Sequence, residues 1–122
     1  MNRIAVVDDE PDITTVLKKG LEHHGFAVDG FNDPQAALDS FKPGHYDLMI
    51  IDIRMPRLNG FDLYRELKKR DENVKVCFLT AFEIYYDEFK KMFPTVDVRA
   101  FIRKPVSISN LVTQVNATIN SS

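Results

Sequence analysis

The chain has 122 residues, of which 44% are hydrophobic, and its 16 basic and 18 acidic side chains give a net charge of -2. This length and apolar content suit one domain with a single core. The nearly even charge balance argues against direct binding to the phosphate backbone of a nucleic acid. No apolar stretch is long enough to cross a bilayer and no signal peptide is recognisable, so we expect a cytoplasmic protein without membrane insertion.

Two common kinds of site also find no support in the sequence. The histidines His23, His24 and His45 do not stand beside other metal ligands, which argues against a zinc site. No glycine-rich loop follows the first apolar run, so a dinucleotide or P-loop site is not expected. Cys77 is the one cysteine of the chain and lies inside an apolar run, which predicts a buried thiol.

The first quarter of the chain predicts a strand, a helix and a second strand. Residues 4–7 are a short, β-branched run that suits a buried strand. A helix is expected from Pro11, and Gly25 stops it. Residues 26–31 predict the second strand. The apolar positions of the helix fall at helical spacing: Ile13, Val16, Leu17 and Leu21.

The next stretch repeats the pattern of a helix followed by a strand. Asp33 is a suitable N-cap and Pro34 suits the first helical position, so a helix is predicted to about Phe41. A proline-glycine turn follows. Residues 47–51 are apolar enough to be a strand that is buried on both faces.

The second half of the chain continues the alternation. A third helix is predicted from about Gly60, and residues 74–79 predict a fourth strand. Residues 84–93 predict a helix and residues 96–102 a fifth strand. Ser107 is the expected N-cap of a last helix. Its buried stripe is predicted to be Ile108, Leu111, Val112, Val115 and Ile119.

Five strands that alternate with helices, written (βα)5, predict an α/β fold. Connections of helical length require a mostly parallel sheet with helices on both faces. We therefore expect a doubly wound, five-stranded parallel sheet in the order 2-1-3-4-5.

Polar side chains follow four of the predicted strands directly. Asp8 and Asp9 follow the first strand, and Asp52 follows the third. Thr80 and Lys104 follow the fourth and fifth. Ligands of doubly wound sheets bind beyond the carboxyl ends of the strands, and neighbouring strands are about 4.8 Å apart. We therefore expect these side chains to converge on one site.

Three carboxylates in such a site would repel one another and raise at least one pKa unless a cation lies between them. Lys104 supplies one positive charge against three negative charges. Ligands that are all oxygen favour a hard ion, so the sequence predicts a Mg2+ site, with Mn2+ as a substitute ion. Open coordination positions on the ion would admit a phosphoryl group.

Together these residues resemble the receiver domain of the response regulators of two-component signalling, including single-domain chemotaxis regulators. The resemblance covers nearly the whole chain and implies a flavodoxin-like fold. It also implies that residues 1–122 form one receiver domain, with no output domain in this chain. The motifs that carry the resemblance are Asp8-Asp9, Asp52-x-x-Met55-Pro56-x-x-x-Gly60, Thr80-Ala81 and Lys104-Pro105.

The resemblance implies a phosphorylation switch. Asp52 would be the phosphoacceptor and would take a phosphoryl group from a sensor histidine kinase. Asp9 and Asp52 would bind Mg2+, together with the backbone carbonyl of Arg54. Asp8 would bind the ion directly or through water. Such a domain is not a dedicated enzyme and would at most phosphorylate and dephosphorylate itself.

The resemblance also implies roles for residues around the phosphoacceptor. Lys104 would pair with Asp52 and then with a phosphoryl oxygen, and the Lys104–Pro105 peptide would be cis. The Thr80 hydroxyl would bind another phosphoryl oxygen. Phe101 occupies the position of the family's switch aromatic and could rotate inward when Thr80 moves.

Two further groups of residues are assigned roles from the sequence. Arg54 and Phe82 stand two residues beyond Asp52 and Thr80, where family members tune the lifetime of the phosphoryl group. The segment around them is rich in aromatic residues. We expect Tyr85, Tyr86 and Phe89 to contribute to a docking patch, with core packing as the alternative.

The expected partners are a sensor histidine kinase and a downstream effector or phosphotransfer protein. A homodimer through the face of the fourth helix, fifth strand and fifth helix is a further expectation. Two rival functions remain open: a receiver-like interaction module that is never phosphorylated, and a Mg2+-dependent phosphohydrolase that forms an aspartyl phosphate. Arg54 argues against the hydrolase, since it stands where such enzymes carry a second Asp as general acid.

Overall fold

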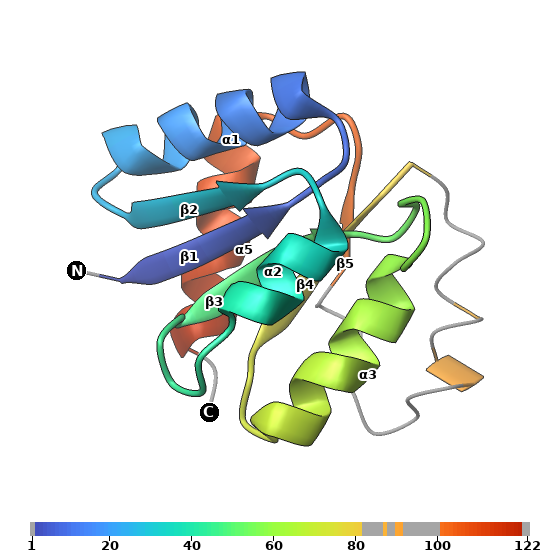
Figure 1. The fold of residues 1–122 in the computed structure, drawn as a ribbon. Helices are drawn as coiled ribbons and strands as arrows, with labels where there is room; N and C mark the ends of the chain where they lie inside the picture. The colour runs from blue at the N-terminus through green and yellow to red at the C-terminus, as the bar shows by residue number, and fades with distance from the viewer. Residues whose placement is uncertain (1, 82–86, 88–89, 92–100, 121–122) are drawn as a thin grey trace.

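The computed structural model describes residues 2–81, 87, 90–91 and 101–120. Five parallel strands form one sheet in the order β2-β1-β3-β4-β5, which confirms the predicted order (Figure 1). The strands are β1 (Arg3–Val7), β2 (Ala27–Phe31), β3 (Leu48–Asp52), β4 (Val76–Thr80) and β5 (Phe101–Arg103).

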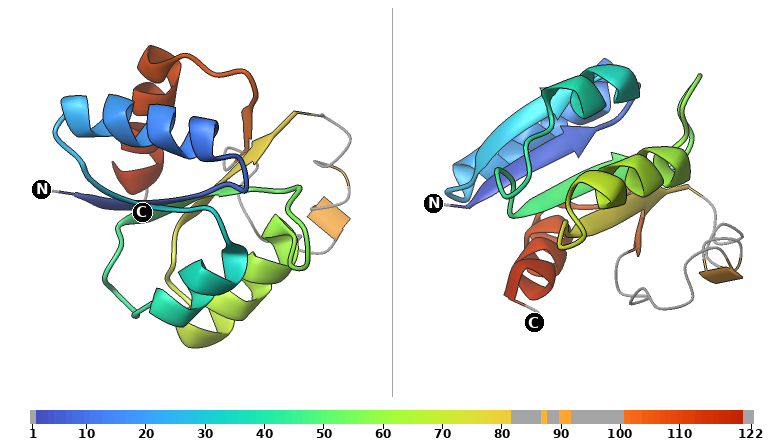
Figure 2. Two further views of the ribbon diagram at one scale, coloured as in Figure 1. Left: turned by 45° about the horizontal axis from the view of Figure 1, so that its top comes forward. Right: turned by 60° about the horizontal axis from the view of Figure 1, so that its bottom comes forward.

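The helices cover both faces of the sheet, as predicted. One face carries α1 (Pro11–His23) and α5 (Ile108–Asn120), and the other carries α2 (Pro34–Ser40) and α3 (Gly60–Arg70), as Figure 2 shows. The helix predicted over 84–93 and residues 96–100 of the predicted fifth strand lie outside the described residues, apart from 87 and 90–91. Within the described part of the chain, no helix is both long and apolar enough to span a membrane.

The three central strands are almost wholly apolar because helices cover them on both sides. Every residue of β3 and β4 is buried, and only the first residue of β1 is exposed. The register pairs Val7 with Ile51 and Thr80 with Arg103. The carboxyl ends of β1, β3, β4 and β5 therefore lie along one edge of the sheet.

Two hydrophobic cores hold the layers together, one on each face of the sheet. The core beneath α2 and α3 centres on Phe78, whose ring meets those of Phe61 and Tyr64 edge to face, with centroids 5.4 and 5.6 Å apart. The opposite core joins α1 and α5 to the sheet and includes Cys77, which is buried as predicted. Both cores fix the height of the helices above the sheet.

The predicted helix ends are confirmed where the sequence carries a cap. The Asp33 side chain accepts a hydrogen bond from the Gln35 backbone N–H at 3.1 Å, and the Ser107 hydroxyl accepts one from that of Asn110, also at 3.1 Å.

Several predicted positions of the apolar stripes are less buried than expected. In α5, Leu111 and Val115 are buried as predicted, whereas Ile108, Val112 and Ile119 are only partly buried. Val16 is 58% exposed, since it lies at the border of the apolar stripe of α1 and not beneath the helix.

Candidate functional site

The polar residues that follow the strands do converge at the carboxyl edge of the sheet. Asp52 and Thr80 are the last residues of β3 and β4, while Asp8 and Lys104 come directly after β1 and β5. Three of them, Asp52, Thr80 and Lys104, line a cavity of about 190 Å3. Its lining residues are Asp9, Glu10, Asp52, Ile53, Arg54, Thr80, Ala81 and Lys104.

The Lys104 ammonium lies between two buried carboxylates. Its Nζ is 2.8 Å from Asp8 Oδ2 and 3.4 Å from Asp52 Oδ1. The sequence suggested Asp52 as the partner, whereas the closer contact is with Asp8. Asp8 is fully buried, so its carboxylate has the greater need of a counter-charge. The Lys104 backbone N–H donates to the Thr80 carbonyl at 2.7 Å, and the Lys104–Pro105 peptide is cis.

A cluster of acids follows β1 and offers oxygen ligands to a metal ion. One carboxylate oxygen from each of Asp8, Asp9 and Glu10 lies within 4.8 Å of the others. Oxygen donors alone suit a hard divalent cation such as Mg2+. Glu10 was not predicted as a site residue, although its place directly after Asp8-Asp9 could have indicated it. These residues therefore fit a magnesium ion beside Asp52.

Asp52 is an unusually weak acid for an aspartate. Burial and the nearby Asp8 carboxylate raise its pKa from 3.8 to about 6, and Lys104 offsets part of this rise. For Lys104, burial lowers the pKa, but the hydrogen bond to Asp8 and the attraction of Asp52 outweigh it, so its pKa is raised. The site thus holds more negative charge than its lysine neutralises.

The start of α3 lies directly against the backbone of the phosphoacceptor candidate. A Cβ atom at Gly60 would lie 2.5 Å from the Asp52 carbonyl oxygen and 2.9 Å from Ile53 Cα. The Gly60 N–H donates to the Ile53 carbonyl at 2.8 Å, and the Asn59 side chain caps the helix. Only glycine allows this approach, which accounts for its place eight residues after Asp52.

The remaining predicted site residues divide into two groups. Arg54 is exposed and lines the cavity, Thr80 is buried beside it, and the Phe101 ring lies 5.6 Å from that of Phe78. Phe82 and the predicted docking patch of Tyr85, Tyr86 and Phe89 lie outside the described residues.

Comparison with known proteins identifies the family. The family model described as the response regulator receiver domain matches residues 4–116. The chain belongs to this family. Among curated relatives of this receiver domain, the transcriptional regulatory protein PcoR of Escherichia coli is 31% identical over 98% of the chain and 52% of its own length. The response regulator SaeR of Staphylococcus aureus is 29% identical over 95% of the chain and 50% of its own length. The chain therefore spans about half the length of these relatives.

Solved structures give the same result. The non-phosphorylated HemR receiver domain of Leptospira biflexa is 25% identical, with a TM-score of 0.84 over 100% of this chain and 97% of that one. The response regulator TrrA of Thermotoga maritima, solved in complex with Mg2+ and BeF, is 32% identical, with a TM-score of 0.82 over 97% and 99%. The chain is thus a receiver domain of the two-component type, a class of regulatory phosphoacceptors whose acidic pocket binds Mg2+.

The raised pKa of Asp52 predicts that Asp52→Asn stabilises the metal-free domain at neutral pH. The folded pKa lies above the unfolded value of 3.8, so the folded state binds the proton more tightly and its stability falls as pH rises from 3.8 to about 6. Asparagine carries no ionisable group, so the Asp52→Asn variant does not lose stability in this way. We expect its free energy of unfolding to exceed that of the wild type by about 1–3 kcal/mol above pH 6.

Urea unfolding in EDTA between pH 4 and 8 measures this difference. The gap between the two proteins should open across the titration of Asp52, because other groups titrate alike in both. Asp39→Asn, at an exposed position of α2, is the matched control and should show no such gap. A wild type as stable as the Asp52 variant at every pH would contradict the prediction.

Proposed function

We propose that this receiver domain accepts a phosphoryl group on Asp52 from the phosphohistidine of a sensor histidine kinase, in a reaction that requires Mg2+. The observation that carries the proposal is the placement of Asp52. Asp52 is 6% exposed and opens into the small cavity that Lys104, Thr80, Asp9 and Glu10 also line. A buried nucleophile that opens into such a cavity can be reached by a small phosphoryl group and is shielded from bulk water.

The transfer needs positioning and charge neutralisation more than acid–base chemistry. An Asp52 Oδ attacks phosphorus, a P–O bond forms, and the P–N bond breaks with its electron pair returning to the histidine nitrogen. Lys104 stands 3.4 Å from Asp52 and would bind a phosphoryl oxygen. The Thr80 hydroxyl would bind another.

The residues that would hold magnesium are Asp8, Asp9, Asp52 and the Arg54 carbonyl, with Glu10 close by. The ion would supply positive charge to the carboxylates and to the incoming phosphoryl oxygens. Without it, repulsion between these groups opposes transfer. We propose that Arg54 and Phe82 then set how long the acyl phosphate survives.

Acetyl phosphate tests the chemistry without a kinase. Incubation with acetyl phosphate and Mg2+ should add one phosphoryl group to the intact mass, because Asp52 is the single proposed acceptor. EDTA or Asp52→Asn should abolish the adduct.

Asp9→Asn should form the adduct far more slowly, which separates the metal site from the nucleophile. No adduct from either acetyl phosphate or a phosphorylated kinase would contradict the proposal and favour a phosphorylation-independent binding module. An adduct retained in Asp52→Asn would place the acceptor elsewhere.

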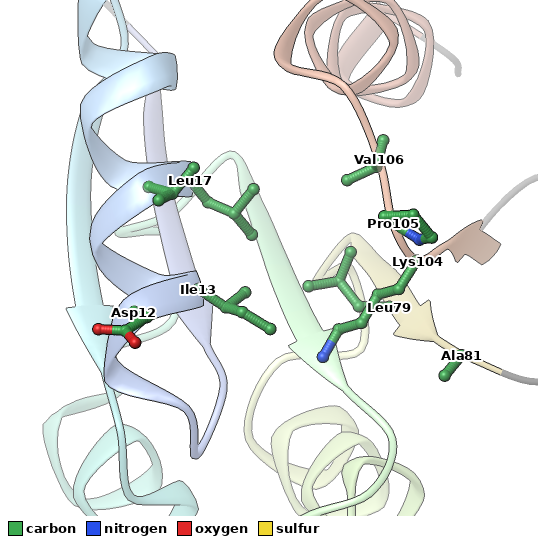
Figure 3. A pocket seen from close by; sticks show the side chains of 9 residues that line it. Asp12, Ile13, Leu17, Leu79, Ala81, Lys104, Pro105 and Val106 are labelled. Carbon is green, nitrogen blue, oxygen red and sulfur yellow. The ribbon is translucent and has the colours of Figure 1, made fainter.

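A second cavity adjoins the site and suits the surface of the kinase. It has a volume of about 480 Å3 and shares Ala81 and Lys104 with the smaller cavity. Figure 3 shows Ile13 of α1 pointing across it toward Leu79. Its other lining residues are Asp12, Val16, Leu17, Pro105 and Val106.

A kinase that brings its phosphohistidine to Asp52 must cover the rim of the site. The larger cavity is the apolar part of that rim, and Val16 leaves a large hydrophobic side chain exposed there. Apolar surface of this kind gains free energy when a partner buries it. We therefore place the docking surface for the histidine kinase between α1 and the segment before α5.

Val16→Asp should separate docking from chemistry. A charge in the apolar cavity should lower the rate of transfer from a phosphorylated kinase by about tenfold or more, since burying an unpaired carboxylate is costly. Phosphorylation by acetyl phosphate should not change, because this donor needs no docking surface.

Thr15→Asp places the same charge on the neighbouring exposed position and serves as the control. The kinase must be one that phosphorylates the wild-type domain. Equal rates for Val16→Asp and the wild type would rule out this cavity as the docking surface.

Phosphorylation is proposed to change the surface around β5 and α5, through Thr80 and Phe101. Thr80 pairs with Arg103 in the sheet, and the partly buried Phe101 packs on Phe78 in the same pair of strands. A movement of Thr80 toward a phosphoryl oxygen would alter the packing of Phe101. An effector, a phosphotransfer protein or a second receiver domain could read this change.

Phe101→Trp provides an optical test, because the chain contains no tryptophan. Addition of beryllofluoride and Mg2+ should shift the emission to shorter wavelength as the ring becomes more buried. Phe41→Trp, at the end of α2 and away from β5, should not respond. Unchanged Phe101→Trp emission in protein saturated with beryllofluoride and Mg2+ would exclude this residue as the switch.

A further inference from the structure

Two polar side chains, those of Asn32 and Thr14, form hydrogen bonds with the backbone between Asp8 and Glu10. The Asn32 amide, in the loop after β2, donates to the Asp8 carbonyl at 3.0 Å and to the Thr14 hydroxyl at 2.8 Å. The Thr14 hydroxyl, in the first turn of α1, donates to the Asp8 carbonyl at 3.1 Å, with the Glu10 carbonyl at 3.3 Å as a second acceptor. Three separate segments thus meet at one carbonyl group.

The donors and acceptors of this network match completely. An amide nitrogen has two N–H donors, and Asn32 uses both. A carbonyl has two lone pairs, and that of Asp8 accepts from both Asn32 and Thr14. The opposite orientation of the Asn32 amide would bring two oxygens together at the Asp8 carbonyl. The Asn32 amide therefore has one orientation in this network.

Packing fixes Thr14 in place as well. Thr14 is 6% exposed, and a Cβ atom at Gly30 of β2 would lie 2.6 Å from its Cγ2. Glycine at this position lets α1 approach β2 closely enough for Asn32 to reach the hydroxyl. The Asp8 N–H also donates to the Phe31 carbonyl at 3.0 Å. Both sides of the Asp8 backbone are thus tied to the β2 region.

None of these bonds reaches a carboxylate of the acidic cluster. The carboxylate oxygens of Asp8 instead accept from the Glu10 N–H at 2.9 Å and from Lys104 at 2.8 Å. The network acts on the peptide that leads from Asp8 to Asp9 and Glu10, and so on the direction in which their side chains leave the chain.

We propose that Thr14 and Asn32 are positioning residues for the metal site: they fix the peptide after Asp8 so that the Asp8, Asp9 and Glu10 carboxylates are arranged to bind Mg2+ before the ion arrives. This inference rests on the proposed Mg2+-dependent function. Outer residues that orient metal ligands typically change metal affinity by 10–100-fold when they are replaced. Without the network, binding the ion must also order the turn.

Calorimetric titration with Mg2+ alone tests the proposal on the unphosphorylated domain. Thr14→Val keeps the shape of the side chain and removes the hydroxyl, and Asn32→Ala removes both amide donors. Each should raise the Kd for Mg2+ by about tenfold. Thr14→Ser restores the hydroxyl and should return the Kd to near the wild-type value.

Thr113→Val is the matched control, because the Thr113 hydroxyl likewise donates to a backbone carbonyl, that of Ser109 at 3.1 Å, but on α5 and away from the acids. Its Kd should equal that of the wild type. Thermal unfolding in EDTA, measured on every variant, separates a lost fold from a misplaced turn. If Thr14→Val does not fold, the Kd of Asn32→Ala tests the proposal, because Asn32 lies at an exposed loop position where a substitution should not prevent folding.

The outcomes distinguish this inference from the proposed function. A wild-type domain that does not bind Mg2+ would overturn the proposed function and this inference with it. A wild type that binds Mg2+, beside Thr14→Val and Asn32→Ala variants that bind it equally well, would overturn this inference alone. The same weakening in Thr14→Ser as in Thr14→Val would also overturn it, because the hydroxyl would then not be the cause.

Discussion

The ion pair between Lys104 and Asp8 is the interaction around which the site is organised. Asp8 is fully buried at the end of β1, and Lys104 reaches it from the end of β5 at 2.8 Å. Loss of one partner of a buried pair typically costs about 3–5 kcal/mol, since the other charge is left uncompensated. The pair also spans β3 and β4, and the lysine lies within 3.4 Å of Asp52 at the end of β3. One side chain thereby joins the ends of the first and last strands across the carboxylate of Asp52.

The same pair helps to explain why the pKa of Asp52 is raised. Lys104 gives its shortest contact to Asp8 and leaves Asp52 in a buried place beside another carboxylate, with a pKa raised to about 6. Receiver domains bind a cation in this pocket, and the excess of carboxylates provides the electrostatic reason. The excess of carboxylates thus destabilises the site unless a cation neutralises it.

Much of the architecture could be predicted because it depends on patterns local in sequence. Continuous apolar runs indicated buried parallel strands, and a polar residue after each run indicated the edge where they meet. Features that depend on contacts between distant loops could not be predicted. The preference of Lys104 for Asp8 over Asp52 is a difference between contacts of 2.8 and 3.4 Å, and the hydrogen bond from Asn32 to Asp8 joins residues 24 positions apart. Helical spacing placed Val16 on the apolar stripe, but it could not show that the stripe ends at an open cavity.

The close approach of Gly60 limits how the domain can respond at its site. The first turn of α3 rests on the carbonyl of Asp52, with no room even for a methyl group between them. The end of β3 at Asp52 therefore cannot move toward α3 without a clash. A displacement of Asp52 has to be taken up within the sheet, by its neighbours β1 and β4, so a single hydrogen atom in place of a side chain limits how the site can move.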